Sequence, residues 1–136
     1  MLRAVLDANV LVSATIIHGK QFEILKLAKL GKIKLITSPS IAEEFKEVIS
    51  RDKFGFTESQ VSAAVGQLLD IAEVVIPQQK LLVIEEDPDD NIVLECALES
   101  KADFIISGDT HLLALKSFKN SKIVNAAEFF EKFYVE

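Results

Sequence analysis

The chain has 136 residues, of which 49% are hydrophobic and 26% are charged, and this composition is typical of one globular domain rather than of a disordered chain. The net charge of −6 argues against a general binder of polyanions. A cluster of acidic residues that binds divalent cations can nevertheless become locally positive. The one cysteine, Cys96, excludes an internal disulfide framework and a cysteine-based zinc site.

The first apolar run covers residues 3–6 and ends at Asp7, which is too early for a signal peptide. No apolar run in the sequence approaches the ~18 residues that a membrane-spanning helix needs. We therefore expect a cytoplasmic protein without a membrane segment.

Short strand-like runs alternate with longer helical patterns along the chain. We predict strands over residues 3–6, 33–37, 73–76, 103–108 and 122–125. We predict helices over residues 9–17, 22–30, 41–50, 57–71 and 90–100, and a last helix from about residue 126. The alternation indicates a single α/β domain, residues 1–136, whose mainly parallel sheet is covered by helices on both faces.

Helix start and stop signals support several of these boundaries. Gly31 is the stop signal of the second helix. Ser38 is placed to cap the third helix, with Pro39 in its first turn. Thr57 and Gln60 form a capping box that opens the fourth helix.

Four acidic residues lie far apart in sequence but at positions that a fold could gather. Asp7 and Asp109 directly follow predicted strands, and ligands of open parallel sheets bind beyond such strand ends. Glu44 and Asp90 lie on or beside the apolar stripe of a predicted helix. A carboxylate placed toward the core needs a partner, and oxygen ligands suit Mg²⁺ or Mn²⁺. The four acids therefore predict a divalent-cation site.

These acids also have structural explanations, which the sequence leaves open. Asp7 and Asp109 are each placed to cap the helix that follows, and Asn9 could replace Asp7 in that role. At about 100° per residue, Asp90 falls in the middle of the apolar stripe of its helix. Asp89 lies off that stripe and could serve as the cap. We therefore favour Asp90 as a first-turn carboxylate that points at a site.

Glu43 and Glu44 have the same charge and helix propensity, but helical geometry separates them. An apolar stripe is formed by Ile41, Phe45 and Val48. Glu44 lies at the edge of this stripe, about 60° from Ile41, and Glu43 lies about 160° from Ile41 on the solvent side. We predict that Glu44 is a ligand and that Glu43 is a solvated side chain.

Three segments stand in a characteristic order along the chain. They are Val-Leu-Asp-Ala-Asn-Val-Leu-Val-Ser at 5–13, Asp-Pro-Asp-Asp-Asn at 87–91 and Ala-Asp-Phe-Ile-Ile-Ser-Gly-Asp at 102–109. In this order and spacing the chain resembles the PIN-domain nucleases, particularly the VapC-type toxins. The resemblance implies a three-layer α/β/α sandwich with a central mainly parallel sheet, and metal-dependent cleavage of RNA phosphodiester bonds.

The resemblance also implies which residues form the site. It implies that four acids bind one or two Mg²⁺ or Mn²⁺ ions and carry out the catalysis: Asp7, Glu44, Asp90 and Asp109. It gives supporting polar roles to Asn9, Ser13 and Ser107. The cations would activate a water for in-line attack on the phosphodiester and stabilise the leaving oxygen.

Two positions depart from the family's pattern. Residue 8 is Ala where many members carry Thr or Ser. Residue 111 is His where some members carry another acid. A fifth carboxylate is therefore not assumed, and His111 could either bind a metal or merely cover the site.

The resemblance further implies an RNA substrate, a protein antitoxin that covers the acids, and a homodimer. Apolar segments at 54–56 and 129–130 also favour a dimer contact. The alternative is a non-catalytic PIN-like module that binds RNA or protein, and the presence of all four acids speaks against it. A receiver-like domain would need an acid beside Asp7, and a phosphatase of the haloacid dehalogenase type would need Asp at position 9, which is Asn.

Overall fold

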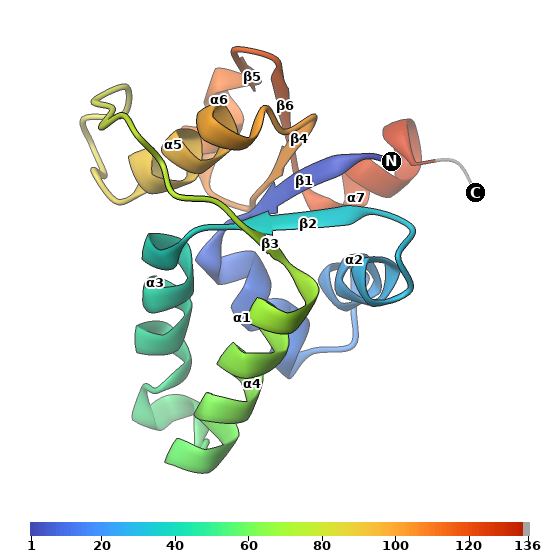
Figure 1. The fold of residues 1–136 in the computed structure, drawn as a ribbon, viewed down its shortest axis with the longest axis vertical. Coiled ribbons are helices and arrows are strands. Elements are labelled where there is room, and N and C mark those ends of the chain that lie inside the picture. The colour runs from blue at the N-terminus through green and yellow to red at the C-terminus, as the bar shows by residue number, and fades with distance from the viewer. Residues whose placement is uncertain (135–136) are drawn as a thin grey trace.

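The computed structural model of the protein describes residues 1–134, and these residues form one sheet with helices on both sides (Figure 1). The strands are β1 (Arg3–Leu6), β2 (Lys34–Thr37), β3 (Glu73–Val74), β4 (Phe104–Ile106), β5 (Ser117–Phe118) and β6 (Ser121–Val124). The helices are α1 (Ala8–Ile16), α2 (Lys20–Lys29), α3 (Pro39–Ile49), α4 (Glu58–Ile71), α5 (Asp90–Ser100), α6 (Thr110–Leu115) and α7 (Ala126–Glu128). Two further helical turns are the 3₁₀ turn η1 (Asp52–Phe54) and the π-helical turn η2 (Phe129–Phe133).

The strands lie in the order β3-β2-β1-β4-β6-β5, and every neighbouring pair is parallel except β5 and β6. In the centre, Val5 of β1 lies opposite Ile36 of β2 and Ile105 of β4. Because β1 and β4 are adjacent and parallel, their carboxyl ends meet at one edge of the sheet, where ligand sites of open α/β sheets form. The predicted α/β/α sandwich with a mainly parallel sheet is confirmed.

Helices cover both faces of the sheet. In Figure 1, α1 to α4 lie on one side of the central strands, and α5 and α6 lie on the other. Successive residues of a strand point to opposite faces, and Ala4, Val5 and Leu6 of β1 are all fully buried. This double coverage explains why the central strands are continuous apolar runs rather than alternating ones. Within residues 1–134, no helix is long and apolar enough to cross a membrane.

The predicted helix signals act as expected. Gly31 has a φ of +74°, the left-handed conformation that favours glycine after a helix. Ser38 accepts a hydrogen bond on Oγ from the backbone N–H of Ile41 at 3.3 Å. Thr57 and Gln60 exchange the two hydrogen bonds of a capping box. The boundaries of α2, α3 and α4 therefore fall within two residues of the prediction.

The sheet differs from the prediction at its margins. β3 and β4 are shorter than the predicted runs at 73–76 and 103–108, and β5 was not predicted. β5 has only two residues, and Lys116 before it adopts a left-handed φ of +64°. Two residues give no alternation to read, so a strand of this length leaves no periodic signal in the sequence.

The helix predicted from about residue 126 begins there as α7, and the C-terminal segment then joins the core. α7 ends at Glu128, and η2 continues the chain. Phe129 is fully buried, and its ring centroid lies 5.3 Å from that of Phe104. Phe133 packs on Phe104 from another direction at 5.2 Å. The expected dimer contact at 129–130 is therefore wrong for Phe129, which is a core residue.

Candidate functional site

Asp7 follows β1 directly and is the N-cap of α1. Its Oδ1 accepts a hydrogen bond from the backbone N–H of Val10 at 2.8 Å, and its Oδ2 accepts one from the hydroxyl of Ser107. Asp7 is 6% exposed, and this burial raises the pKa of its carboxyl, although the hydrogen bonds from Ser107 and Val10 act in the opposite direction. Asp7 thus caps a helix and stands at a strand end at the same time, so the two interpretations of its position are compatible.

Asp109 lies three residues beyond the end of β4 and is the N-cap of α6. Its Oδ1 accepts hydrogen bonds from the backbone N–H groups of His111 at 2.8 Å and Leu112 at 3.1 Å. Its own N–H donates to Oγ of Ser107 at 2.9 Å. Because the same hydroxyl donates to Asp7, Ser107 connects the acids at the ends of β1 and β4. Ser107 is 1% exposed, so this connection is shielded from water.

Asp90 is the first residue of α5 and lies opposite α6. Its Oδ2 is 3.8 Å from Nδ1 of His111. That oxygen is buried and has no hydrogen-bond partner among residues 1–134. Burial raises the pKa of Asp90 to about 7, and the charges of Asp109 and Asp87 contribute to the rise. An unpaired buried carboxylate among like charges is stable only with a proton or a cation.

Asp89 and Asp90 are neighbours at the N-terminus of α5, but their side chains have different surroundings. Asp89 occupies the N-cap position, but its side chain makes no capping hydrogen bond. Asp89 is therefore the N-cap by position, but its side chain does not cap the helix. Asp90 lies in the first turn of α5 as predicted, and its Oδ2 accepts no hydrogen bond from the backbone of residues 1–134.

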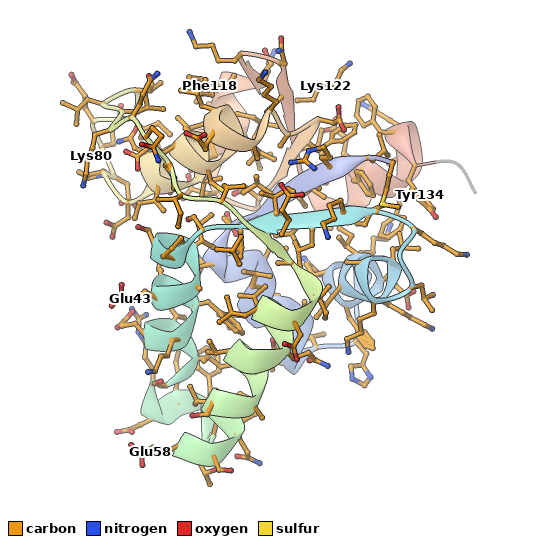
Figure 2. All side chains as sticks on the ribbon, viewed as in Figure 1. Glu43, Glu58, Lys80, Phe118, Lys122 and Tyr134 are labelled. Atoms are coloured by element: carbon orange, nitrogen blue, oxygen red, sulfur yellow. The ribbon has the colours of Figure 1, made fainter. Side chains whose placement is uncertain are left out.

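Glu43 and Glu44 lie on α3 as helical geometry predicts. Glu43 is exposed and points away from α3 (Figure 2). Glu44 is half-buried, and burial raises its pKa to about 6, with contributions from the charges of Asp89 and Asp7. The predicted difference in exposure between Glu43 and Glu44 is therefore confirmed.

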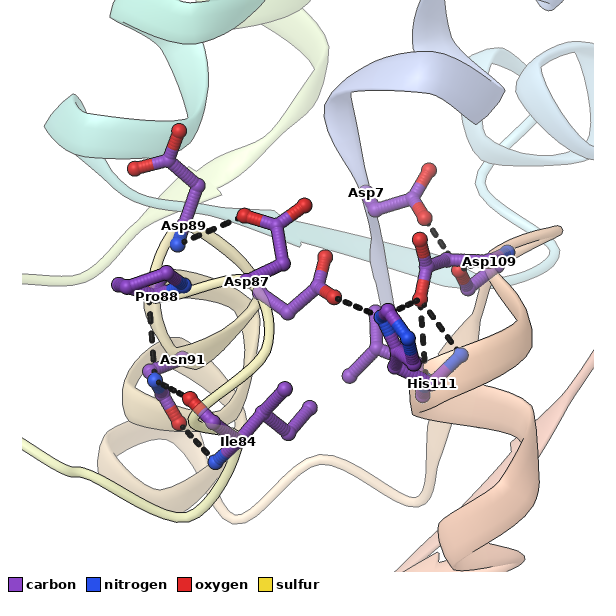
Figure 3. A network of polar contacts seen from close by, with 11 residues as sticks. Asp7, Ile84, Asp87, Pro88, Asp89, Asn91, Asp109 and His111 are labelled. Carbon is purple, nitrogen blue, oxygen red and sulfur yellow. Dashed lines mark hydrogen bonds and ion pairs between the residues drawn. The ribbon is translucent and has the colours of Figure 1, made fainter.

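Asn91 holds the segment that leads into these acids, a role that the sequence did not reveal. Its Oδ1 accepts hydrogen bonds from the backbone N–H groups of Val83 at 3.0 Å and Ile84 at 2.9 Å (Figure 3). Its Nδ2 donates to the carbonyl oxygens of Ile84 at 2.8 Å and Pro88 at 3.2 Å. Asn91 is 2% exposed. A polar amide beside an apolar stripe was the available signal, because a buried amide needs partners.

Asp87 is a further acid near the site that the prediction did not include. It is half-buried, and its Oδ1 accepts a hydrogen bond from the backbone N–H of Asp89 at 3.2 Å (Figure 3). Its charge raises the pKa of both Glu44 and Asp90. The sequence signal that could have indicated Asp87 is the next residue, Pro88, because this proline turns the chain at the start of α5.

The three expected supporting residues have different surroundings. Ser107 is hydrogen-bonded to Asp7 and Asp109, as described above. Asn9 is exposed and does not replace Asp7 as the cap of α1. Ser13 is half-buried on α1, and among residues 1–134 its side chain makes no hydrogen bond to an acid. Ser107 is thus the one of the three that the structure joins to the acids.

The structure brings Asp90, Asp109 and His111 closest together. One potential ligand atom from each lies within 4.8 Å of the other two. Asp7 and Glu44 are outside this tight set. From here on, the term acidic group denotes the four acids predicted from sequence: Asp7, Glu44, Asp90 and Asp109.

The chemistry of the acidic group suits a divalent cation. Its donors are carboxylate oxygens, which Mg²⁺ and Mn²⁺ prefer. The buried Oδ2 of Asp90 has no hydrogen-bond partner in the described part of the chain, and the carboxyls of Asp90, Glu44 and Asp7 all have raised pKa values. The ion pairs of Arg3, Arg51 and Lys132 are made with other glutamates. These cations therefore do not neutralise the acidic group.

Comparison with known proteins gives one family and one fold. A family model described as "PIN domain" matches residues 3–111. Among solved structures, the chain is similar to one in the crystal structure of VapBC2 from Rickettsia felis bound to a DNA fragment from their promoter, with a TM-score of 0.64, 15% identity and coverage of 91% of this chain and 98% of that chain. At this identity the likeness shows the fold alone. No curated protein matches the sequence.

Proposed function

The chain belongs to the PIN-domain family, and from this premise we propose that it is a metal-dependent ribonuclease. The observation that carries the proposal is the acidic group, in which the buried Oδ2 of Asp90 has no hydrogen-bond partner among residues 1–134. A divalent cation, Mg²⁺ or Mn²⁺, would supply the missing positive charge, lower the pKa of an attacking water and stabilise the leaving 3′ oxygen of a phosphodiester.

The four residues of the acidic group would contribute to cation binding in different ways. The carboxylate of Asp7 is fixed in orientation by hydrogen bonds from the Val10 backbone and the Ser107 hydroxyl. The carboxylate of Asp109 is fixed by two backbone N–H groups of α6, and its own backbone N–H donates to Ser107. A carboxylate has about four lone-pair positions, so these hydrogen bonds leave room for a metal. Asp90 contributes the unpaired oxygen, and Glu44 adds charge from α3. Ser107 would be a positioning residue that acts through both strand-end acids.

We propose RNA as the substrate and a role as the toxin of a toxin–antitoxin pair. The support is the family and the similarity to a chain from a VapBC2 structure. A protein antitoxin would cover the acidic group, and an Arg is the side chain that best pairs with several carboxylates. We also propose that the protein forms a homodimer.

An RNA cleavage assay tests the proposed activity. The purified protein is incubated with RNA and Mn²⁺ or Mg²⁺, with and without EDTA, and we expect cleavage only when the free metal is present. Asp7→Asn and Asp90→Asn are each expected to abolish cleavage while the circular dichroism spectrum stays native. The control is Asp70→Asn, which removes the same charge from an exposed position of α4.

Two results would contradict the proposal. Cleavage that persists in EDTA would rule out the metal dependence. A folded wild-type protein that binds RNA but cleaves none with either metal would favour the non-catalytic PIN-like module.

A further inference from the structure

Helix α6 places an imidazole against two carboxylates of the acidic group. His111 lies in the first turn of α6, and its Nδ1 is 3.8 Å from Oδ2 of Asp90 and 3.9 Å from Oδ1 of Asp109 (Figure 3). The His111 side chain is 45% exposed. Because solvent is open to it, burial of the ring does not explain why it lies over the two acids.

These two separations are too long for hydrogen bonds and short enough for two ligands of one ion. Hydrogen bonds between nitrogen and oxygen have lengths of about 2.7–3.2 Å. Ligands of Mg²⁺ lie ~2.0–2.1 Å from the ion, so two ligands of one ion are at most ~4.2 Å apart, and slightly more for a larger ion. The 3.8 and 3.9 Å separations are below this limit. Oδ2 of Asp90 is the free ligand atom of the two, because Oδ1 of Asp109 already accepts two backbone hydrogen bonds.

We propose that His111 is a nitrogen ligand of the cation held by the acidic group and that it shifts the preference of the site from Mg²⁺ toward Mn²⁺ and Co²⁺. The inference rests on the proposed function, because it takes the acidic group as a cation site. Mg²⁺ binds almost entirely to oxygen ligands, whereas first-row transition metals also accept imidazole nitrogen, and their affinities rise from Mn²⁺ to Co²⁺. One nitrogen among carboxylates therefore changes which ion binds best, and not only how tightly an ion binds.

A rival role for the same ring makes the opposite prediction. A protonated His111 could serve as a counter-ion for Asp90 and Asp109 and would then compete with any metal. Removal of a competing cation strengthens the binding of every divalent ion. Removal of a ligand weakens binding, and it weakens Mn²⁺ and Co²⁺ binding more than Mg²⁺ binding.

Calorimetric titration of the tag-free protein with Mn²⁺, Co²⁺ or Mg²⁺ alone separates these roles. For His111→Ala we expect the affinity for Mn²⁺ and Co²⁺ to fall at least tenfold, roughly what the loss of even an outer-shell partner costs. The affinity for Mg²⁺ is expected to fall much less, so the ratio of the Mn²⁺ and Mg²⁺ affinities decreases. His111→Asp, which makes all ligands oxygens, is expected to decrease that ratio further by raising the Mg²⁺ affinity.

The chain offers a matched control in its only other histidine. His18 lies between α1 and α2, and its ring contacts that of Phe22 with centroids 4.3 Å apart. His18→Ala is expected to bind all three metals like the wild type. Pulsed electron paramagnetic resonance of bound Mn²⁺ gives a second readout. The modulation from an imidazole nitrogen is expected in the wild type and in His18→Ala, and its absence is expected in His111→Ala.

The outcomes distinguish failure of this inference from failure of the proposed function. Tighter binding of all metals by His111→Ala, an equal loss for Mn²⁺ and Mg²⁺, or nitrogen modulation that persists in that variant would overturn the role of His111. In each case, loss of Mn²⁺ binding in Asp90→Asn would still support the acidic group as the cation site. A wild type that binds none of the three metals would overturn both.

Discussion

Replacement of Asp90 by Asn is expected to stabilise the metal-free protein at neutral and alkaline pH. The pKa of Asp90 rises from 3.8 to about 7, first through burial and then through the charges of Asp109 and Asp87. A raised pKa means that the folded protein binds this proton more tightly than the unfolded chain does. The stability from this group is therefore fully present below pH 3.8 and is lost as the pH rises to about 7.

The size of the effect follows from the same pKa. Each pH unit between the unfolded and folded pKa values is worth ~1.4 kcal/mol, so the full loss has an upper limit of ~4 kcal/mol. The Asp90 side chain is 13% exposed, and its contact with solvent and small rotations of the side chain reduce the free-energy cost of the buried charge. We expect Asp90→Asn to gain ~1–2 kcal/mol of unfolding free energy at pH 8 after this discount. For a domain of this size, that gain corresponds to a rise in Tm of roughly 4–8 °C.

Thermal unfolding followed by circular dichroism, in EDTA at pH 5, 6.5 and 8, measures this gain. The difference in Tm between Asp90→Asn and the wild type is expected to widen as the pH rises. The control Asp70→Asn is expected to follow the wild type. Added Mn²⁺ is expected to raise the Tm of the wild type more than that of Asp90→Asn, because ligands stabilise the state that binds them. A variant that is less stable at every pH, or a difference that does not change with pH, would refute the reasoning.

Three further predictions concern the acids, the loop and the assembly. Glu44→Gln is expected to reduce metal-dependent cleavage strongly, whereas Glu43→Gln is expected to leave it nearly unchanged and to alter stability by less than ~0.5 kcal/mol; equal cleavage rates would contradict the placement of the site. Asn91→Ala is expected to lower the unfolding free energy in urea by ~2–4 kcal/mol, because two backbone N–H groups lose their acceptor, and the exposed Asn120→Ala is the neutral control. Light scattering is expected to show a homodimer, and a monomer at all concentrations would remove that proposal.

The elements that could be predicted from sequence are those with strong local signals. α5 spans residues 90–100 as predicted, because its apolar stripe is regular and Pro88 precedes it. The capping box of α4 and the glycine after α2 also lie within a few residues of the structure they specify. β5 could not be predicted, because its two residues pair with β6 only once the hairpin has formed.

Some features of the candidate site could likewise be predicted from sequence, and others could not. The positions of Asp7 and Asp109 follow from strand ends that meet at one edge of a parallel sheet. The separation of Glu43 from Glu44 follows from helix periodicity alone. The position of His111 against Asp90 depends on the spacing between α5 and α6, and the contacts of Asn91 depend on where an irregular loop passes. No local pattern determines a distance between two separate elements, so the sequence leaves these two contacts unspecified.

Anomalous scattering from Mn²⁺ in crystals of the protein tests the central claim most directly. Crystals of the wild type grown with Mn²⁺ are expected to show an anomalous peak among Asp7, Asp90 and Asp109, and crystals of Asp90→Asn are expected to show no such peak. Absence of a peak at the acidic group of the wild type, or an equal peak in Asp90→Asn, would contradict the assignment of these acids as a cation site.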